Sequence, residues 1–335
     1  VETGYVRASL RSGNTPYGTA VFSLTQDGVV VSEAGVASSP PTTGARFFVD
    51  YGAKTAAGPA GTGAGPVNVS TGIAIVNPNN VEAGLTWTLR DAQGRMLTVG
   101  HGTLAAGAHR ARMIDQLADL APDFVWPGGF PGQSYGSLEI RANQPVSVAA
   151  LRLTVNQAGR TLLTTTPVAD LNATLGTGSL VFPQIADGEG YTTAVILMNT
   201  SDGVESGTLQ LWSPEGAELG ALPAGAGSVR YTIPAGGVYR IETGGTPSEV
   251  RVGWAQVTPD AGPAPTGAAI FGRTSGGRLV TETAVAAATS TVHARMYVDL
   301  SGGHNSGLAL AAAGASISQP MASARSCRSP TRRPV

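Results

Sequence analysis

The sequence predicts an all-β protein built as tandem β-sandwich domains, with at most one short helix in each unit. Three observations predict this class. Glycine (46) and proline (22) make up about a fifth of the 335 residues, which indicates many short elements joined by turns. Most apolar segments alternate with a period of two, as half-buried strands do. A long internal repeat indicates an array of similar units.

The composition excludes some classes of protein and favours export. Charged residues make up 13% of the chain, and the formal net charge is -1. No nucleic-acid partner is expected, because no basic stripe is present to neutralise phosphates. No apolar run is long enough to span a bilayer. The chain begins at Val1 without a signal peptide, so we expect a mature or excised fragment of a secreted or cell-surface protein.

The clearest pattern is the recurrence of residues 18–50 in residues 267–299, at a constant offset of 249. Fourteen of the 33 paired positions are identical. A second match pairs residues 71–78 with 306–313, and a fainter one pairs 71–97 with 193–219 at an offset of 122. These offsets predict two related unit types that alternate along the chain.

The predicted organisation follows from these offsets. Its parts are the C-terminal part of a preceding sandwich unit (1–38), unit one (45–170), unit two (180–288), the start of a further unit one (293–314) and an irregular basic tail (315–335). The tail has four arginines and breaks the repeat, so we expect that a truncation or a shifted reading frame ends the repeat there. A tail that binds an anionic polymer is the alternative.

Strands are expected wherever apolar and polar residues alternate. In "GLTWTLR" the residues Leu85, Trp87 and Leu89 share the inward face, and in "GTLQLWS" Leu209 and Leu211 do so. The other expected strands, in chain order, are Val29–Ser32, Phe47–Tyr51, Ser137–Arg141, Val146–Thr154, Leu162–Thr165, Val229–Ile233, Val238–Ile241, Arg251–Gln256 and Leu279–Thr283.

Turns and one helix complete the expected elements. Asp91–Gly94 and Ser213–Gly216 are predicted as tight hairpins in which glycine takes a positive φ. Ala111–Ala121 is the only helical pattern, with Ile114, Leu117 and Ala121 on one face, and it is expected to cap one end of a sandwich.

The sequence contains no motif for nucleophilic catalysis or for a histidine-based metal site. No G-x-S-x-G elbow is present, and no histidines are paired as H-x-H or H-E-x-x-H. The histidines are therefore interpreted as solvated loop residues: His101, His109, His293 and His304. Cys327 is the only cysteine, so no disulfide can form within the chain, and it is interpreted as a bystander thiol.

Paired carboxylates leave a hydrolase hypothesis open. Glycoside hydrolysis needs two carboxylates, and one pair recurs at the offset of 249. The pair is Glu33 with Asp50, repeated as Glu282 with Asp299. Recurrence in every unit favours a structural role, such as pairing with Arg46 and Arg295, because an active site is seldom duplicated along a stalk.

Two segments are candidates for ligand binding. Asp187 and Glu189 lie on a glycine loop that could hold calcium through oxygen ligands, although a plain loop is favoured; no other cofactor is expected. An aromatic loop holds Phe124, Trp126, Phe130 and Tyr135, whose rings could stack on sugar faces. Its alternative interpretation is a loop that folds its rings over the end of the sandwich.

Four phrases carry a resemblance to a known group: "FPQIADGEGYTTAVILMNTSD", "YTIPAGGVYRIETGG", "GAAIFGRTSGGRLVTETAVA" and "TGIAIVNPNN". They resemble a repeat of large secreted proteins of soil bacteria, in which two modules alternate. The resemblance covers nearly all of residues 1–314, and implies Ig-like sandwiches, export and a modular architecture. It offers no catalytic motif to carry over.

The leading functional hypothesis is a non-enzymatic extracellular structural or adhesion module from a tandem array. The first alternative is a carbohydrate-binding module that uses the aromatic loop, and the second is a carboxylate-dependent glycoside hydrolase. Expected partners are neighbouring domains of a longer chain, and a polysaccharide or a cell surface. An unpaired edge in a partial unit would be a site for strand addition.

Overall fold

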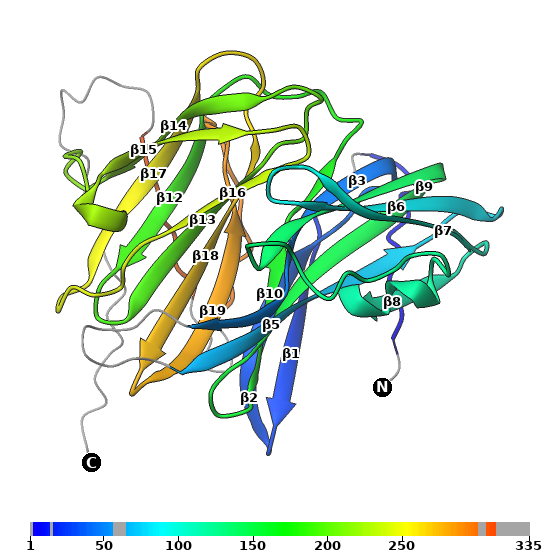
Figure 1. The fold of residues 1–335 in the computed structure, drawn as a ribbon, viewed down its shortest axis with the longest axis horizontal. Helices are drawn as coiled ribbons and strands as arrows, with labels where there is room; N and C mark the ends of the chain where they lie inside the picture. The colour runs from blue at the N-terminus through cyan, green and yellow to red at the C-terminus, as the bar shows by residue number, and fades with distance from the viewer. Residues whose placement is uncertain (1–2, 14–15, 56–64, 301–305, 313–335) are drawn as a thin grey trace.

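The computed structural model describes residues 3–13, 16–55, 65–300 and 306–312. Nearly all of the regular structure is β, which confirms the expected all-β class. Within these residues nineteen strands form one isolated hairpin and two pairs of larger sheets (Figure 1). No helix in the described part of the chain is long and apolar enough to cross a membrane.

The first sandwich is built from two facing sheets. One has the order β11-β3-β9-β6-β7, and the other has the order β8-β5-β9-β10 with β4 on the outer edge of β5. The strands are β3 (Thr42–Asp50), β4 (Gly52–Thr55), β5 (Pro66–Val76), β6 (Ala83–Asp91), β7 (Met96–Leu104), β8 (His109–Met113), β9 (Tyr135–Val155), β10 (Thr161–Thr166) and β11 (Val168–Asp170).

Strand β9 belongs to both sheets of the first sandwich. Residues 135–142 pair with β3 and β6, whereas residues 147–155 pair with β5 and β10. The two strands expected at Ser137–Arg141 and Val146–Thr154 are therefore one continuous strand. The crossing from sheet to sheet lies at Pro145, where the missing N–H is tolerated because the ladder changes partners there.

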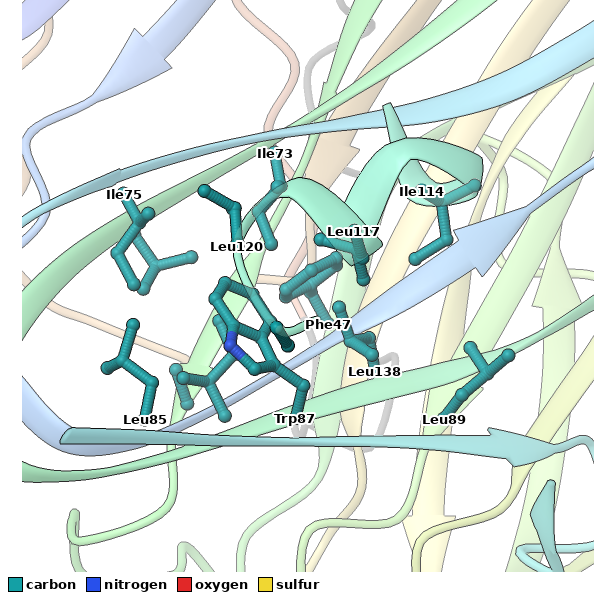
Figure 2. Packing of buried hydrophobic residues seen from close by; sticks show 14 of the residues in the cluster. Phe47, Ile73, Ile75, Leu85, Trp87, Leu89, Ile114, Leu117, Leu120 and Leu138 are labelled. Carbon is teal, nitrogen blue, oxygen red and sulfur yellow. The ribbon is translucent and has the colours of Figure 1, made fainter. Parts of the chain in front are cut away.

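The core of the first sandwich lies between its two sheets. Trp87 is fully buried, and Leu85 and Leu89 share its face, so the expected inward face of β6 is confirmed. Figure 2 shows these side chains together with residues from the opposite sheet and from the short helix, among them Ile73 and Leu117. Burying each such apolar side chain contributes about 1.5–3 kcal/mol to stability.

The second sandwich repeats the connections of the first. Its sheets have the orders β12-β17-β14-β15 and β16-β13-β18-β19. The strands are β12 (Leu180–Asp187), β13 (Tyr191–Met198), β14 (Glu205–Trp212), β15 (Ser228–Ile233), β16 (Val238–Glu242), β17 (Arg251–Pro259), β18 (Thr266–Ser275) and β19 (Arg278–Ala286). Strands β17 and β18 here take the places of the two halves of β9, and Leu209 and Leu211 are buried as expected.

The same side-chain contacts recur in both sandwiches, and one of them recurs again in the segment after β19. The Asn77 amide donates to the carbonyls of Val81 and Leu104, and Asn199, 122 positions later, donates to those of Gly203 and Ile233. In a second recurring contact, a Thr or Ser hydroxyl accepts the backbone N–H of an earlier residue and donates to the C=O of that same residue. The pairs are Thr71 and Asp50, Thr193 and Ala186, and Ser306 and Asp299.

Both predicted hairpin turns are confirmed, whereas the predicted helix is partly wrong. Gly94 and Gly216 have φ values of 76° and 83°. The segment Ala111–Ala121 begins inside β8, and only Ile114–Asp119 is helical, as a 3₁₀ helix, η1. The chain pairs with β5 through Met113, so those residues stay extended while Ile114 and Leu117 still face the core. A second 3₁₀ turn, η2, spans Pro223–Gly225.

Candidate functional site

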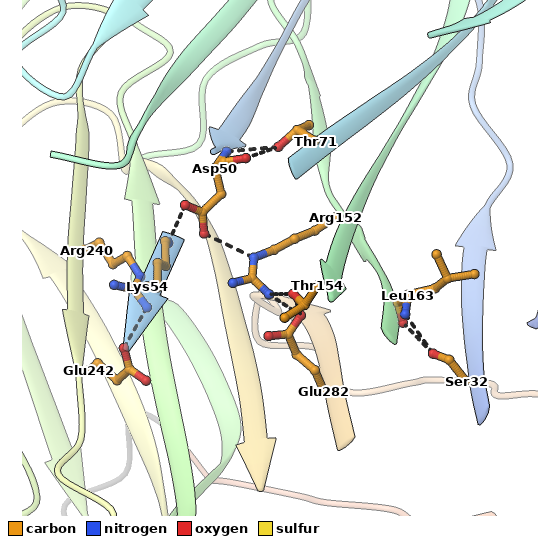
Figure 3. Close-up of polar contacts among 10 residues, drawn as sticks. All are labelled: Ser32, Asp50, Lys54, Thr71, Arg152, Thr154, Leu163, Arg240, Glu242 and Glu282. Atoms are coloured by element: carbon orange, nitrogen blue, oxygen red, sulfur yellow. Dashed lines mark hydrogen bonds and ion pairs between the residues drawn. The ribbon is translucent and has the colours of Figure 1, made fainter. Parts of the chain in front are cut away.

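The most concentrated set of buried charges lies where the two sandwiches meet. We call it the joint network, and it consists of Asp50, Lys54, Arg152 and Glu282 (Figure 3). Asp50 ends β3, Lys54 lies on β4 and Arg152 lies on β9, all in the first sandwich, whereas Glu282 lies on β19 of the second. Asp50 and Glu282, which the repeat assigns to different copies, therefore converge on one arginine.

Arg152 is the centre of the joint network. Its Nε lies 3.1 Å from Asp50 Oδ2, and its Nη1 forms an ion pair with Glu282 Oε1. Thr154 accepts a hydrogen bond from Arg152 Nη1 at 2.9 Å and donates one to Glu282 Oε1 at 3.0 Å. Asp50 also forms an ion pair with Lys54. The arginine thus joins carboxylates from both sandwiches.

Burial and neighbouring charges set the ionisation of the joint network. Burial alone would raise the pKa of Asp50, but Arg152 and Lys54 outweigh it and hold that pKa below the usual value. Burial lowers the pKa of Lys54 to about 8, against the opposing effect of Asp50. Burial acts to lower the pKa of Arg152, but Glu282 and Asp50 more than offset this effect and raise it. The arginine therefore stays charged between the two carboxylates.

The recurring carboxylates are placed differently from what the sequence predicted. Asp50 does not pair with Arg46, whose Nη2 instead lies 2.5 Å from Glu139 Oε2. The reason is strand geometry, because Arg46 and Glu139 are directly opposite on β3 and β9. Glu33 accepts a hydrogen bond of 2.6 Å from Ser23 on the neighbouring strand of the hairpin.

Further contacts between the sandwiches surround the joint network. Arg46 Nη1 donates to the Asn199 carbonyl at 2.8 Å, and Ser137 Oγ donates to the Gly236 carbonyl at 2.8 Å. The Val238 N–H donates to the Ala92 carbonyl at 2.9 Å. An apolar cluster at the same interface, the joint cluster, contains Phe48 from the first sandwich with Ala194, Ile196, Met198, Val238 and Ile270 from the second.

The aromatic loop folds largely inward. Phe124 and Phe130 are buried in the core of the first sandwich. Trp126 packs on that core, with Tyr51 at 4.7 Å and Phe130 at 6.2 Å between ring centroids. Tyr135, at the start of β9, contacts Phe48 of the joint cluster. The faces of Phe124 and Phe130 contact protein side chains, so sugar binding by this loop would depend on Trp126 and Tyr135.

The two acidic residues of the glycine loop, Asp187 and Glu189, lie in different environments. Asp187 is buried: its Oδ1 accepts the Gly245 N–H at 2.7 Å, and its Oδ2 lies 2.5 Å from Arg251 Nη2. Glu189 is exposed and has a positive φ of 52°. Among the described residues no group of three or more His, Cys, Asp or Glu side chains could hold a metal ion.

Two of the histidines differ from their expected positions, whereas His293 lies exposed outside the strands, as expected. His101 lies on β7 and His109 begins β8, so the expectation that both lie in loops is wrong. The His101 imidazole Nδ1 lies 2.8 Å from the exposed carboxylate of Asp123. His304, Cys327 and the predicted basic tail (315–335) lie outside the described residues.

Two functional features escaped sequence reasoning. Arg152 follows the alternation of its strand but points to the interface between the sandwiches, and no local signal marks that surface. Trp212 and Trp254 lie directly opposite each other on β14 and β17, stacked at 5.9 Å with 23° between their planes and partly exposed. Trp212 ends β14 and Trp254 lies inside β17, and each alternates with buried neighbours on its strand, which is the signal that could have paired them.

No family model matches this chain, and the comparison with curated proteins returns no match. Among solved structures, one described as Thermotoga maritima 1070 is similar to part of the chain, with a TM-score of 0.24 and 16% sequence identity. That similarity covers 37% of this chain and 94% of the Thermotoga maritima chain.

Proposed function

We propose that this protein is a non-enzymatic extracellular structural module of Ig-like sandwiches, which holds neighbouring domains of an array at a fixed spacing and orientation. The observation that carries the proposal is the joint network, in which one buried arginine binds carboxylates of both sandwiches. A flexible linker would not need such a contact. Charges are buried at an interface only where partners are held in good geometry, since an unpaired buried charge costs several kcal/mol.

The joint cluster supports the same role. Inter-domain interfaces that are polar and small permit domain motion, whereas apolar ones restrict it. Phe48 is buried among side chains of the second sandwich, next to the backbone hydrogen bond from Val238 to Ala92. Apolar packing, ion pairing and main-chain bonding thus act together across the joint.

The hydrolase alternative has less support. A catalytic carboxylate must contact its substrate, and an acid must hold a proton near neutral pH. Asp50 is fully buried, and its pKa lies below the usual value because of Arg152 and Lys54. Glu282 is bound by Arg152 and Thr154. These carboxylates are occupied in joining the sandwiches.

A distance measurement across the joint tests the proposal. Spin labels are attached at Val125→Cys in the first sandwich and Glu215→Cys in the second, both exposed, in a Cys327→Ser background. A fixed joint gives one narrow distance distribution by double electron–electron resonance. Phe48→Asp, which places a charge in the joint cluster, broadens the distribution.

The matched control is Val252→Asp, at an exposed position on β17. This change introduces the same charge away from the joint and leaves the distribution narrow. A broad distribution with the unaltered joint would contradict a fixed spacing, and so would a Phe48→Asp distribution as narrow as that of the control.

A second candidate function, carbohydrate binding, is favoured by the pair Trp212 and Trp254. Aromatic faces stack on sugar rings, and this pair lies on the outer face of a sheet beside the polar residues Gln210 and Gln256. Affinity electrophoresis against a panel of polysaccharides tests it. Retardation that Trp254→Ala removes and Trp126→Ala leaves assigns binding to this face, whereas the reverse result assigns it to the aromatic loop. No retardation on any glycan excludes both.

A further inference from the structure

The isolated hairpin of β1 (Thr19–Gln26) and β2 (Val29–Ala37) has the same construction as the hairpin β18–β19. Both turn through two residues of positive φ, Asp27 with Gly28 and Gly276 with Gly277. Both have a β-bulge at the same place, at Val31 and at Val280, 249 positions apart. Both are closed by the same backbone bond, from Ser38 to Gly18 and from Ala287 to Gly267.

The two hairpins differ in whether the outer edge of their first strand, β1 or β18, pairs with a further strand. Strand β18 pairs with β19 on one side and, on the other side, with all eight residues of β13 in antiparallel register. In that register Phe271 is opposite Thr193. Strand β1 repeats β18, with Phe22 in place of Phe271, but within the described residues it pairs with β2 alone.

The repeated residues differ in exposure, and the buried one, Ile270, lies against both β13 and Phe48 of the first sandwich. Val21 is 63% exposed, whereas Ile270 at the matching position of β18 is 5% exposed. Phe22 is 48% exposed, and Phe271 is partly buried against the core of the second sandwich. The hairpin is attached to the first sandwich through β2, where the Ser32 hydroxyl bonds both the N–H and the C=O of Leu163 on β10. Covering the apolar surface that remains exposed on β1 would stabilise the hairpin further.

Strand β1 also lacks the charges that protect some of the other sheet edges. Edge strands usually avoid unwanted pairing by carrying charges or proline. In this protein the edge strand β8 carries Arg110 and Arg112, and the edge strand β15 carries Arg230. The segment Thr19–Gln26 has no charged residue and no proline. Its edge is therefore suited to receive another strand.

We propose that the outer edge of β1 is a strand-addition site whose occupant is an uncharged strand with the pattern of β13 (Tyr191–Met198), supplied by another unit of the array. The register is that of β18, which places the occupant's Thr193-type hydroxyl residue opposite Phe22. Main-chain hydrogen bonds supply the affinity, and the alternating side chains of the occupant cover Val21 and Phe22. The proposal rests on the array role proposed above and names the partner of one of its surfaces.

Peptide binding tests the site. The probe is a labelled synthetic peptide of residues 189–201, and fluorescence anisotropy measures its binding to the full chain. In β13 alternate amides bond to β18 and to β16, because successive residues of a strand direct their N–H groups to opposite sides. One peptide is therefore N-methylated at Thr193, Val195 and Leu197, and a second at Thr192, Ala194 and Ile196.

Strand addition predicts that only one of the two methylation patterns weakens binding. Three lost hydrogen bonds lower the affinity by about tenfold or more, since each contributes about 0.5–1.5 kcal/mol. The other pattern leaves the affinity near that of the unmodified peptide. Equal affinities for all three peptides would indicate contact with an apolar face and overturn the proposal, as would no binding of the unmodified peptide.

Register is checked by disulfide trapping. In a Cys327→Ser background, Phe22→Cys is expected to form a disulfide with a peptide carrying Thr193→Cys, and not with one carrying Leu197→Cys. Dimerisation of the chain through β1 that the peptide does not displace would show that a second copy is the occupant and would contradict the proposal. Failure of the peptide to bind leaves the spin-label distances across the joint unchanged, so the two proposals fail separately.

Discussion

Arg152 illustrates how one residue can join two folded bodies. It is buried, and its partners Asp50 and Glu282 come from β3 and β19, so its contacts exist only when both sandwiches are docked. The neutralising partners keep the charge tolerable in a buried position. Removing the arginine would leave Glu282 buried without a counter-charge and Asp50 paired with Lys54 alone among the described residues, which is worse than replacing the whole set by apolar residues.

We therefore expect Arg152→Ala to lower the free energy of unfolding by about 3–5 kcal/mol, as measured by urea denaturation. Arg230→Ala is the matched control, because the pair of Arg230 with Asp260 is largely exposed, and it leaves the urea midpoint unchanged. A loss below about 1 kcal/mol for Arg152→Ala would show that the network contributes no more than a surface pair.

Glu205 makes stability depend on pH in a defined window. It is buried at the start of β14, and burial raises the pKa of its carboxyl to about 7 from its ordinary value of 4.5. Below the lower value both folded and unfolded states are protonated. As the pH rises from the lower value to the higher, the unfolded chain releases its proton first, so stability falls with rising pH across this window.

Glu205→Gln should remove this loss. We expect the variant to gain about 1–3 kcal/mol relative to the unaltered protein between acid and mildly alkaline pH, measured by urea denaturation across that range. Glu215→Gln, in an exposed turn, should leave the pH profile unchanged. The prediction is wrong if the Gln and Glu proteins keep the same pH profile.

The turns after β6 and β14 share a local structure but differ in their contacts with the rest of the molecule. The turn after β6 is a tight hairpin with Gly94 at positive φ, like the turn after β14. In addition, Gly94 packs against the backbone of Ala235 and Gly237 in the turn between β15 and β16. A side chain there would overlap the Ala235 carbonyl, so this turn is both a local hairpin and part of the joint.

Comparing two glycines separates these roles. Gly107→Ala changes a positive φ of 67° where a Cβ meets open space, and we expect a cost of about 1 kcal/mol from the backbone alone. Gly94→Ala has the same backbone cost and also displaces the second sandwich, so its thermal midpoint should fall further. Equal midpoints for the two variants would show that the Gly94 contact adds nothing to stability.

The local elements were largely predictable, whereas their lengths and partners were not. Period-two alternation placed Leu85, Trp87 and Leu89 correctly, because the direction of a side chain on a strand depends only on its neighbours in sequence. The union of two strands into β9 escaped prediction, since it depends on which sheet each half pairs with. Met113 stays extended for the same reason, because it pairs with β5.

The whole molecule is held as two docked sandwiches by buried contacts. Salt screens exposed charges strongly and buried pairs much less. Arg152 and Asp50 are almost inaccessible to solvent, and the joint cluster is apolar. The spacing between the sandwiches should therefore be insensitive to ionic strength.

Small-angle X-ray scattering checks this expectation. We expect the radius of gyration to stay constant between about 0.05 M and about 1 M NaCl, where the Debye length falls from more than 10 Å to about 3 Å. Phe48→Asp should make the radius of gyration larger at both salt concentrations. Expansion of the unaltered protein at high salt would mean that exposed ion pairs hold the sandwiches together.

The amino-acid pattern was sufficient for the all-β class, the inward faces and the glycine turns, because alternation and positive φ are properties of neighbouring residues. It also identified Asp50 and Glu282 as recurring carboxylates, but not their shared partner. Arg152 lies 102 residues from Asp50, and the two meet only after β3 and β9 enter one sandwich and β19 docks from the other. Contacts between distant segments depend on how whole sheets pack, so the joint and its charges emerged only from the folded structure.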